Sequence, residues 1–567
     1  MENRRNLLLI AVLFMGLLLW NAWQKQNTPP VMPVSQQSVS SNLEDETELA
    51  NEPTKLSSAA ITSNVIPKDA QGLSDTVGEA IKVRTDTLNI SIDSLGGNIT
   101  QASLPLYPLS INAPTVPYTL LSSNPITKYN APSGLIGNYA NQKFTTHVKF
   151  KTEQPSYAMT ADQNSLVVPL TWEDQNGLVI NKIFTFHRGS YVVDVNYQVI
   201  NRSQQPWSGH FTAQLRRKPL PQKSSLFGLQ SAAEVAYSSP EDRYQKRSFS
   251  KMKKEDLSQD VLGGWIAMSE RYFLSAWIPP AQQNAHFFTQ VDSTQDLYTI
   301  GLIGPNIQVM PNQQAAFAAR LYIGPEDTET LQKIAPGLNL TVDYGWLWVI
   351  SMALFWLMNQ IHKFVGNWGF SIIIVTLLIK GVFYHLSAKS YRSMARMRTL
   401  QPKIQALRDQ IGDDKQKLSQ ATMELYKKEK INPFGGCLPI LVQIPVFIAL
   451  YWVLIDSVEL RQAPFILWIH DLSIKDPYYI LPIIMGLTML IQQKLNPPPP
   501  DPMQAKMMMF LPVVFTAFFL HFPAGLVLYW IVNNVVSILQ QWYITRKYGQ
   551  EPPRDNKYKR AYRLAKK

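Results

Sequence analysis

Lys380 is a lone cation inside an apolar run that extends from about residue 367 to 386. Counted from Asn367, thirteen residues at about 1.5 Å each place the lysine ~20 Å along a helix. An ammonium costs ~2.5 to 3.5 kcal/mol at the centre of a membrane, so it either reaches back to the headgroups or faces a water-filled cavity. We favour the cavity, which would be a site for a polar or acidic partner.

Other polar residues interrupt apolar runs at positions from which they could reach the same cavity. Thr376 precedes Lys380 by one helical turn, and Gln443 lies in the next run. Each alone is more often a hydrogen-bonded contact between helices, but together with a buried cation they predict a hydrophilic groove open to the cytoplasm. Four more share one face of the last run by their spacing: Trp530, Asn534, Ser537 and Gln541.

Motifs for enzymatic or cofactor chemistry are missing from the sequence. It contains no GxxxxGK[ST], GxGxxG or HExxH pattern, and its only cysteine, Cys437, cannot form an intrachain disulfide or a cysteine-based zinc site. Four scattered histidines have no metal-ligand spacing: His147, His187, His210 and His286. We therefore predict a protein that is not an enzyme and has no cofactor or metal, although a sugar-binding or sugar-modifying role for the middle region stays open.

The apolar runs predict six membrane spans. Residues 4–23 pair two arginines with an apolar stretch and lack a small-x-small cleavage site, which favours a retained anchor (1–25) over a cleaved signal peptide. A shorter run within 341–365, rich in tryptophan, predicts an amphipathic helix along the outer interface. The remaining spans, within a core of 366–545, are expected at about 367–386, 434–454, 478–491, 507–521 and 525–544.

The distribution of charge predicts the orientation of these spans. Residues 387–433 contain eleven Lys or Arg against five acidic residues, whereas 455–477 contain two against four. The tail at 546–567 contains nine basic and two acidic residues. By the positive-inside rule both termini are cytoplasmic. This pattern accounts for the net charge of +12 better than a nucleic-acid partner does, and the helical spacing within 387–431 predicts a cytoplasmic hairpin.

The region between the first two spans divides in two. Residues 26–75 are polar, without apolar periodicity, and are expected to be a flexible linker. Residues 76–340 show apolar residues at every second position, as in 193–199, 211–215 and 317–323. Such alternation predicts strands with one buried and one wet face. We therefore expect a large antiparallel β-sandwich outside the inner membrane.

The core spans carry a specific resemblance. GNWGFSIIIVTLLIKG (366–381), NPFGGCLPILVQIPVFIALY (432–451) and FPAGLVLYWIVNN (522–534) are similar to the YidC family of membrane protein insertases, as are stretches at 397–420 and 457–482. The resemblance implies a polytopic α-helical protein of the bacterial inner membrane. It would have six transmembrane helices, a five-helix insertase core around a cytoplasm-facing groove, and an all-β periplasmic supersandwich domain. Its implied partners are nascent membrane proteins, the phospholipid bilayer and the Sec translocon.

The resemblance also implies residue roles. Lys380 occupies the place of the family's usual groove arginine, which keeps the charge but loses bidentate pairing. Thr376, Gln443 and Trp530 match groove-wall positions, and the predicted groove also includes Asn534 and Ser537. His385 replaces a proline common in relatives, so we expect an unkinked helix end there. The hairpin and basic tail would contact the signal recognition particle pathway and the ribosome.

Two alternatives remain on the residues alone. A transporter or lipid-handling protein could use Lys380 as an intramembrane substrate or ion site. An outer-facing enzyme on a membrane anchor would need a cluster of carboxylates or histidines in 76–340, which the sequence does not assemble.

Overall fold

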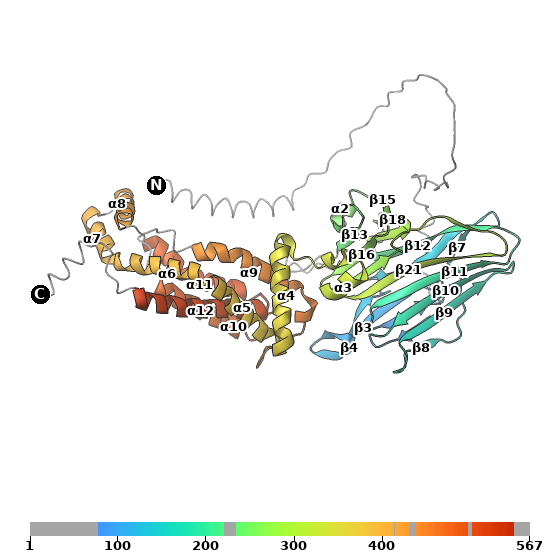
Figure 1. Cartoon of the computed structure of the whole chain (residues 1–567), viewed down its shortest axis with the longest axis horizontal. Coiled ribbons are helices and arrows are strands. Elements are labelled where there is room, and N and C mark those ends of the chain that lie inside the picture. The colour runs from blue at the N-terminus through green and yellow to red at the C-terminus, as the bar shows by residue number, and fades with distance from the viewer. Residues whose placement is uncertain (1–77, 220–233, 413, 430–437, 497–501, 549–567) are drawn as a thin grey trace, which may run out of the picture.

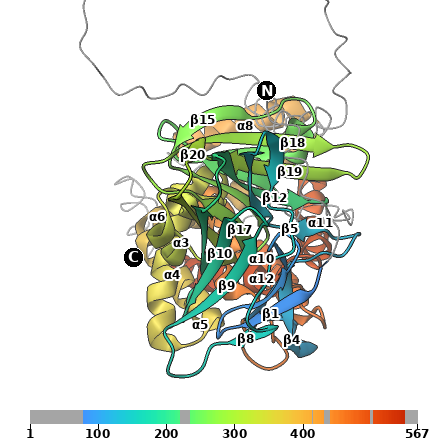
Figure 2. The same cartoon turned by 90° about the vertical axis from the view of Figure 1, so that its right-hand side faces the viewer.

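The computed structural model describes residues 78–219, 234–412, 414–429, 438–496 and 502–548. The expected anchor (1–25), the linker (26–75) and most of the tail lie outside these residues. The described chain forms two regions at opposite ends of its long axis, a β-sheet domain (78–335) and a bundle of helices (Figure 1). Figure 2 looks along that axis from the sheet end, with the helices behind the strands.

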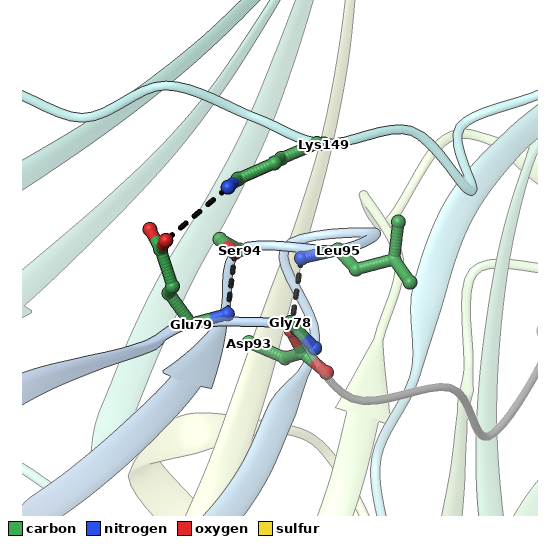
Figure 3. Close-up of polar contacts among 6 residues, drawn as sticks. All are labelled: Gly78, Glu79, Asp93, Ser94, Leu95 and Lys149. Atoms are coloured by element: carbon green, nitrogen blue, oxygen red, sulfur yellow. Dashed lines mark hydrogen bonds and ion pairs between the residues drawn. The ribbon is translucent and has the colours of Figure 1, made fainter.

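The β-sheet domain begins with a set of hydrogen bonds that hold the start of its first strand. Asp93 accepts from the backbone N–H of Gly78 at 2.8 Å and of Leu95 at 2.9 Å (Figure 3). A Cβ at position 78 would lie 2.6 Å from that carboxylate, so glycine fits here where other residues would clash. Lys149 also pairs with Glu79 at 3.3 Å.

Three sheets make up this domain, and antiparallel pairing dominates them. The first has the order β4 (Ala113–Leu121), β3 (Ile99–Ser110), β2 (Asn89–Asp93), β1 (Ala80–Arg84), β8 (Ser156–Ala158). The second has the order β14 (Gln245–Ser248), β13 (Glu234–Ser238), β16 (Trp265–Glu270), β17 (Phe273–Ile278), β21 (Gln313–Pro325), β11 (Val192–Asn201), β10 (Leu178–His187), β9 (Ser165–Glu173). The third has the order β15 (Ser258–Leu262), β18 (Asn284–Asp292), β19 (Leu297–Ile303), β12 (Trp207–Arg217), β6 (Ser133–Tyr139), β7 (Gln142–Thr145), with β5 (Tyr129–Asn130) and β20 (Ile307–Val309) also pairing with β12.

The apolar alternation has different outcomes in two of these strands. In β11 every second side chain from Val193 to Val199 is buried, so the predicted inner and outer faces are confirmed. In β12 the prediction of a wet face is wrong, because Thr212 and Gln214 are buried as well. Both polar side chains are hydrogen-bonded: Thr212 donates to the Leu302 carbonyl at 3.2 Å, and Gln214 accepts from Arg216. A central strand covered on both faces needs such internal partners for its polar residues.

The helices form a bundle whose long members run along the axis of the molecule, whereas α4 (Trp348–Val365) crosses their ends (Figure 1). This orientation differs from that of a span and suits a helix lying along a membrane surface. The bundle comprises α5 (Trp368–Val382), α6 (Tyr384–Thr399), α9 (Leu438–Asp456), α10 (Ile480–Leu495), α11 (Pro502–Phe519) and α12 (Ala524–Tyr548). A short α3 (Thr328–Ile334) links the last strand to this region, and one hydrophobic cluster continues from β16 and β17 through α3 into the bundle.

The helix expected to continue to residue 386 ends at Val382. A bend of 68° separates α5 from α6 at Phe383. The expectation that His385 leaves this helix end unkinked is therefore wrong. Gly381 lies two residues before the bend. Glycine weakens a helix because its backbone loses more entropy on ordering, so the helix can break here without a proline.

By length and composition, α12 is the described helix that could cross a membrane unaided, and α5 with α6 is a bent pair that could do so together. Three apolar helices are shorter, at Val442–Asp456, Ile480–Leu495 and Ala505–Phe519. At about 1.5 Å per residue, the 16 residues of α10 extend ~24 Å, less than the ~30 Å of a typical hydrocarbon core. Gly486 lets α10 approach α11 closely, since a Cβ there would lie 2.1 Å from Thr516 Oγ1.

The basic segment beyond α6 forms two antiparallel helices, α7 (Gln401–Ile411) and α8 (Lys415–Lys428). Pro402 lies in the first turn of α7, where its missing N–H is harmless. Leu400, Ile404 and Tyr426 form a small core between the two helices, and Lys403 pairs with Glu429 at 2.7 Å. The pair contacts the bundle through α6 and has its own core.

Candidate functional site

Lys380 lies in the interior of the bundle, and its position is set by where α5 begins and by which face of α5 is buried. The Asn367 side chain accepts from the Phe370 N–H at 3.2 Å and caps α5, so that Lys380 is the thirteenth residue of the helix. Trp368, Ile372 and Val375 are buried on the same helix and fix its orientation in the bundle. Lys380 itself is 6% exposed, which excludes simple display of the ammonium at the surface.

The ammonium of Lys380 joins three helices. It donates to Ser537 Oγ of α12 at 2.7 Å and approaches Gln443 Oε1 of α9 at 3.5 Å. Ser537 in turn donates to the Asn533 carbonyl at 2.7 Å, so its hydroxyl is oriented to accept from the lysine. Three residues predicted from far-apart parts of the sequence therefore meet at one point.

Gln443 connects Lys380 to two further polar residues, which the sequence did not single out. Its amide donates to the Tyr529 hydroxyl at 3.4 Å and to the Asn533 side chain. Asn533 lies one turn before Ser537, so helical spacing from Ser537 could have found it, but the face chosen from the sequence passed through Asn534 instead. We call Lys380, Gln443, Tyr529, Asn533 and Ser537 the polar cluster.

Thr376 and Trp530 line the neighbourhood without bonding to Lys380. The Thr376 hydroxyl donates to its own helix at Ile372 O, 2.6 Å away, and is buried. Trp530 packs edge-on against Phe447 of α9, with ring centroids 4.7 Å apart, and tilted against Phe519 of α11 at 5.4 Å. Its indole N–H is buried and has no hydrogen-bond partner among the described residues.

Asn534 and Gln541 face a different helix. Asn534 donates to Thr488 Oγ1 of α10 at 3.1 Å, and Gln541 donates to Leu495 O and to Asn496 at the end of α10. Both side chains are buried and act as polar contacts between α10 and α12. The structure therefore does not bring these two residues to Lys380.

The polar cluster holds no counter-ion for Lys380 among the described residues. Among the residues that the structure describes, no carboxylate pairs with Lys380, and its acceptors are neutral side-chain oxygens. Over the same residues, no group of three or more His, Cys, Asp or Glu could hold a metal ion. Such an arrangement can accept a carboxylate or a hydrated polar segment, because the serine and glutamine can rotate away from the ammonium.

Two family models match the chain and together cover most of it. The model described as YidC periplasmic domain matches residues 80–357, and the model described as 60Kd inner membrane protein matches residues 360–551. Their boundary falls in α4, after the last strand, which ends at Pro325, and before α5.

Several relatives are similar over nearly their whole length. A protein of Legionella pneumophila (strain Paris) is 51% identical over 558 residues, covering 98% of both chains, and one of Coxiella burnetii (strain RSA 493 / Nine Mile phase I) is 48% identical, covering 97% of both. Each is described as membrane protein insertase YidC. A crystal structure of an active YidC insertase matches 82% of this chain and 93% of its own, with 16% identity and a TM-score of 0.39.

Proposed function

Because the chain belongs to the YidC family of membrane protein insertases, we propose that its clients enter the bilayer beside the polar cluster around Lys380. The chain is an inner membrane protein with a periplasmic domain, and its substrates are nascent membrane proteins. The prediction of a non-enzymatic insertase is confirmed at the level of the family, which decides against the alternatives of a transporter and of an anchored enzyme.

The proposal depends on one observation, the buried ammonium that has neutral acceptors from two other helices. An incoming acidic or polar segment offers Lys380 a better partner than Ser537 or Gln443, since hydrogen bonds between ions are stronger than those to neutral groups. This change of partner offsets part of the desolvation free energy of moving the segment away from bulk water. We infer a hydrophilic groove at this point, open to the cytoplasm, with Thr376 and Trp530 in its wall and Asn534 outside its polar lining.

Release of the client's apolar helix into lipid would follow α9 and α11. Large apolar side chains on α11 are exposed, among them Phe510 at 70%, as is Ile444 on α9. A client helix that slides along these surfaces exchanges water for hydrocarbon, worth roughly 25 cal/mol per Å² of apolar surface. The short α10 and its close neighbour α11 would thin the membrane locally and shorten the polar segment's path. No nucleotide is needed for such a step.

We further propose the topology and the partners that the charge distribution indicates. Residues 1–25 anchor the chain, 26–75 link the anchor to the periplasmic domain, and both termini are cytoplasmic. The α7–α8 pair carries exposed lysines and arginines into the cytoplasm, where it would meet the signal recognition particle pathway and, with the tail, the ribosome. The Sec translocon would share larger clients.

Depletion of the protein in its host tests the role of Lys380 directly. Protease accessibility of a small two-span client reports insertion, with rescue by wild type, Lys380→Arg or Lys380→Ala. We expect the arginine variant to rescue and the alanine variant to lose about tenfold, the effect of removing roughly 1.4 kcal/mol of charge stabilisation. Lys494→Ala is the matched control, because Lys494 is an exposed lysine at the end of α10. Full rescue by Lys380→Ala would disprove the role of the cation.

A further inference from the structure

The β3–β4 hairpin is the least charged part of the β-sheet domain. Residues 94–127 contain no Asp, Glu, Lys or Arg, whereas 17% of the whole chain is charged. The hairpin lies within this stretch and ends in a turn at Ser110 and Ala113. Its β4 strand forms an edge of the five-stranded sheet, where proteins usually place charges to prevent association. Because this edge strand has no charges, another surface must cover it to prevent association.

Part of the hairpin is fastened by aromatic contacts and part is exposed. Tyr118 stacks on Phe273 with ring centroids 4.2 Å apart, and Tyr107 meets the same ring edge-on at 5.3 Å. These aromatic contacts fasten the hairpin to β17. Apolar side chains remain uncovered toward its tip: Leu106 (64% exposed), Leu109 (51%), Ile111 (39%) and Val116 (46%). We call these four residues the apolar tip.

Contacts with the bundle fix the height of the apolar tip, meaning its position along the long axis of the molecule. Arg461, in the loop between α9 and α10, donates to the carbonyl oxygens of Pro108 at 2.7 Å and Leu109 at 3.2 Å. Gln462 donates to the Pro108 carbonyl at 3.1 Å. The tip thus lies at the outer ends of the membrane helices, at the end of the β-sheet domain that faces the bundle (Figure 1).

The surroundings at this height are those of a membrane interface. The same loop between α9 and α10 exposes Leu467 at 75% and Tyr478 at 66%. Near α4, which crosses the ends of the bundle, Trp346 and Trp356 are exposed at 76% and 62%. Tryptophan and tyrosine concentrate where headgroups meet hydrocarbon. The apolar tip therefore lies at the height of the expected outer membrane interface.

We propose that the apolar tip of the β3–β4 hairpin dips into the outer leaflet of the bilayer and ties the periplasmic domain to phospholipid. Four prolines in the hairpin remove backbone N–H groups that lipid could not satisfy: Pro105, Pro108, Pro114 and Pro117. Lipid fits this surface better than a client polypeptide does, because an extended client would use the N–H donors of the β4 edge that prolines remove. The contact is independent of Lys380.

Quenching of a fluorescent label by lipid tests this placement in the full chain. A bimane label is attached at Leu109→Cys, and separately at Val116→Cys, with Cys437→Ser removing the native thiol. The protein is reconstituted in vesicles with or without phospholipids brominated on their acyl chains. We expect brominated lipid to lower the emission of both labels about twofold, as for a group at the headgroup and acyl boundary.

Met310→Cys provides the matched control. Met310 is an exposed apolar residue (46%) beside the far end of β11 and β21, whose opposite ends face the bundle. Its label should be quenched by aqueous iodide and not by brominated lipid. The proposal would be overturned if iodide quenched the label at 109 as strongly as the label at 310 and brominated lipid did not quench the label at 109. A label at 109 that leaves water only when a client peptide is added would also overturn it, in favour of a polypeptide partner.

Discussion

The two regions of this protein each bury a lysine, and the two sites differ in what surrounds the ammonium. Lys182, on β10 of the β-sheet domain, is fully buried and donates to the carbonyl oxygens of Gly96 at 3.3 Å and Ser133 at 3.1 Å. The rings of Phe184 and Tyr197 lie 5.3 and 5.0 Å from its ammonium. Burial lowers the pKa of Lys182 well below its usual range. Lys380 instead has side-chain acceptors from α9 and α12.

The difference distinguishes the structural role of Lys182 from the functional role that we propose for Lys380. Backbone carbonyls in strands and tight turns cannot move without breaking the sheet, so the partners of Lys182 are permanent. The hydroxyl of Ser537 and the amide of Gln443 can rotate, so the partners of Lys380 can be replaced by those of a client. Burial of a lysine alone therefore does not identify a functional site, and we base the proposal for Lys380 on acceptors that can move.

Charge reversal at Lys380 should produce the largest effect on client insertion. We expect Lys380→Glu to lower insertion of a client with an acidic flank about 100-fold, because roughly 2.8 kcal/mol of attraction is replaced by repulsion. Protease protection of the client measures this loss. Changing the client's acidic residues to lysine should restore insertion. Equal failure of both clients would show that the variant disrupts the bundle rather than the charge match.

Removal of the Lys182 side chain should destabilise the fold and leave the polar cluster intact. Lys182→Ala opens a cavity and removes one donor from each of the Gly96 and Ser133 carbonyls, although Ser133 still accepts from the Tyr197 hydroxyl, so we expect the free energy of unfolding to fall by about 3 kcal/mol. Denaturant titration of the full-length protein in detergent measures it. Lys82→Ala, at an exposed position of β1, should change it by less than about 0.5 kcal/mol. A client-insertion defect at temperatures where the variant stays folded would contradict the structural role of Lys182.

Lys182 should also make the β-sheet domain more stable at higher pH. Its pKa is lowered in the folded state, so below the usual 10.5 the unfolded chain binds the proton more tightly. Stability then rises with pH between the folded and unfolded pKa values, by at most about 1.4 kcal/mol per pH unit. Unfolding measured from pH 7 to 10 should show this slope in the wild type and a smaller one in Lys182→Met. Identical slopes would mean that Lys182 is protonated inside the fold.

Loss of one acceptor of Lys380 should give the smallest effect. Ser537→Ala removes the shorter of the two side-chain hydrogen bonds of Lys380. We expect insertion to fall roughly threefold, the equivalent of about 0.6 kcal/mol. Asn534→Ala on the same helix breaks the bond to Thr488 and should leave insertion unchanged while lowering stability by about 1 kcal/mol. A larger insertion defect in Asn534→Ala than in Ser537→Ala would reverse our placement of the two residues.

Much of the cluster around Lys380 could be predicted, because charged and polar residues inside apolar runs are conspicuous. Lys380, Gln443 and Ser537 stood out for that reason, and the structure brings them together. Asn533 and Asn534 are both polar and adjacent, so helical spacing left their faces undecided. The rotation of α12 against α9 and α10 decided that Asn533 meets Gln443 and Asn534 meets Thr488.

In the β-sheet domain, too, the local pattern predicted part of the structure and packing decided the rest. Alternation predicted the buried face of β11, but the covering of both faces of β12 depends on strands distant in sequence. Lys182 stands at an inward position of β10 between Ile180 and Phe184, and a charged residue there contradicts the pattern that local sequence favours. The carbonyls of Gly96 and Ser133, 86 and 49 residues away in the sequence, accept its hydrogen bonds and make its burial tolerable.

The amino-acid sequence by itself determined that this chain has a β-rich region and apolar helices, where most of its polar interruptions lie, and which family it resembles. These properties follow from composition and periodicity, which depend on neighbouring residues. The tertiary structure decided which interruptions meet, that α5 bends at Phe383, and that Arg461 holds the β3–β4 hairpin at the ends of the bundle. Such contacts depend on helix rotation and strand order, which are set by packing across the whole molecule rather than by any local pattern.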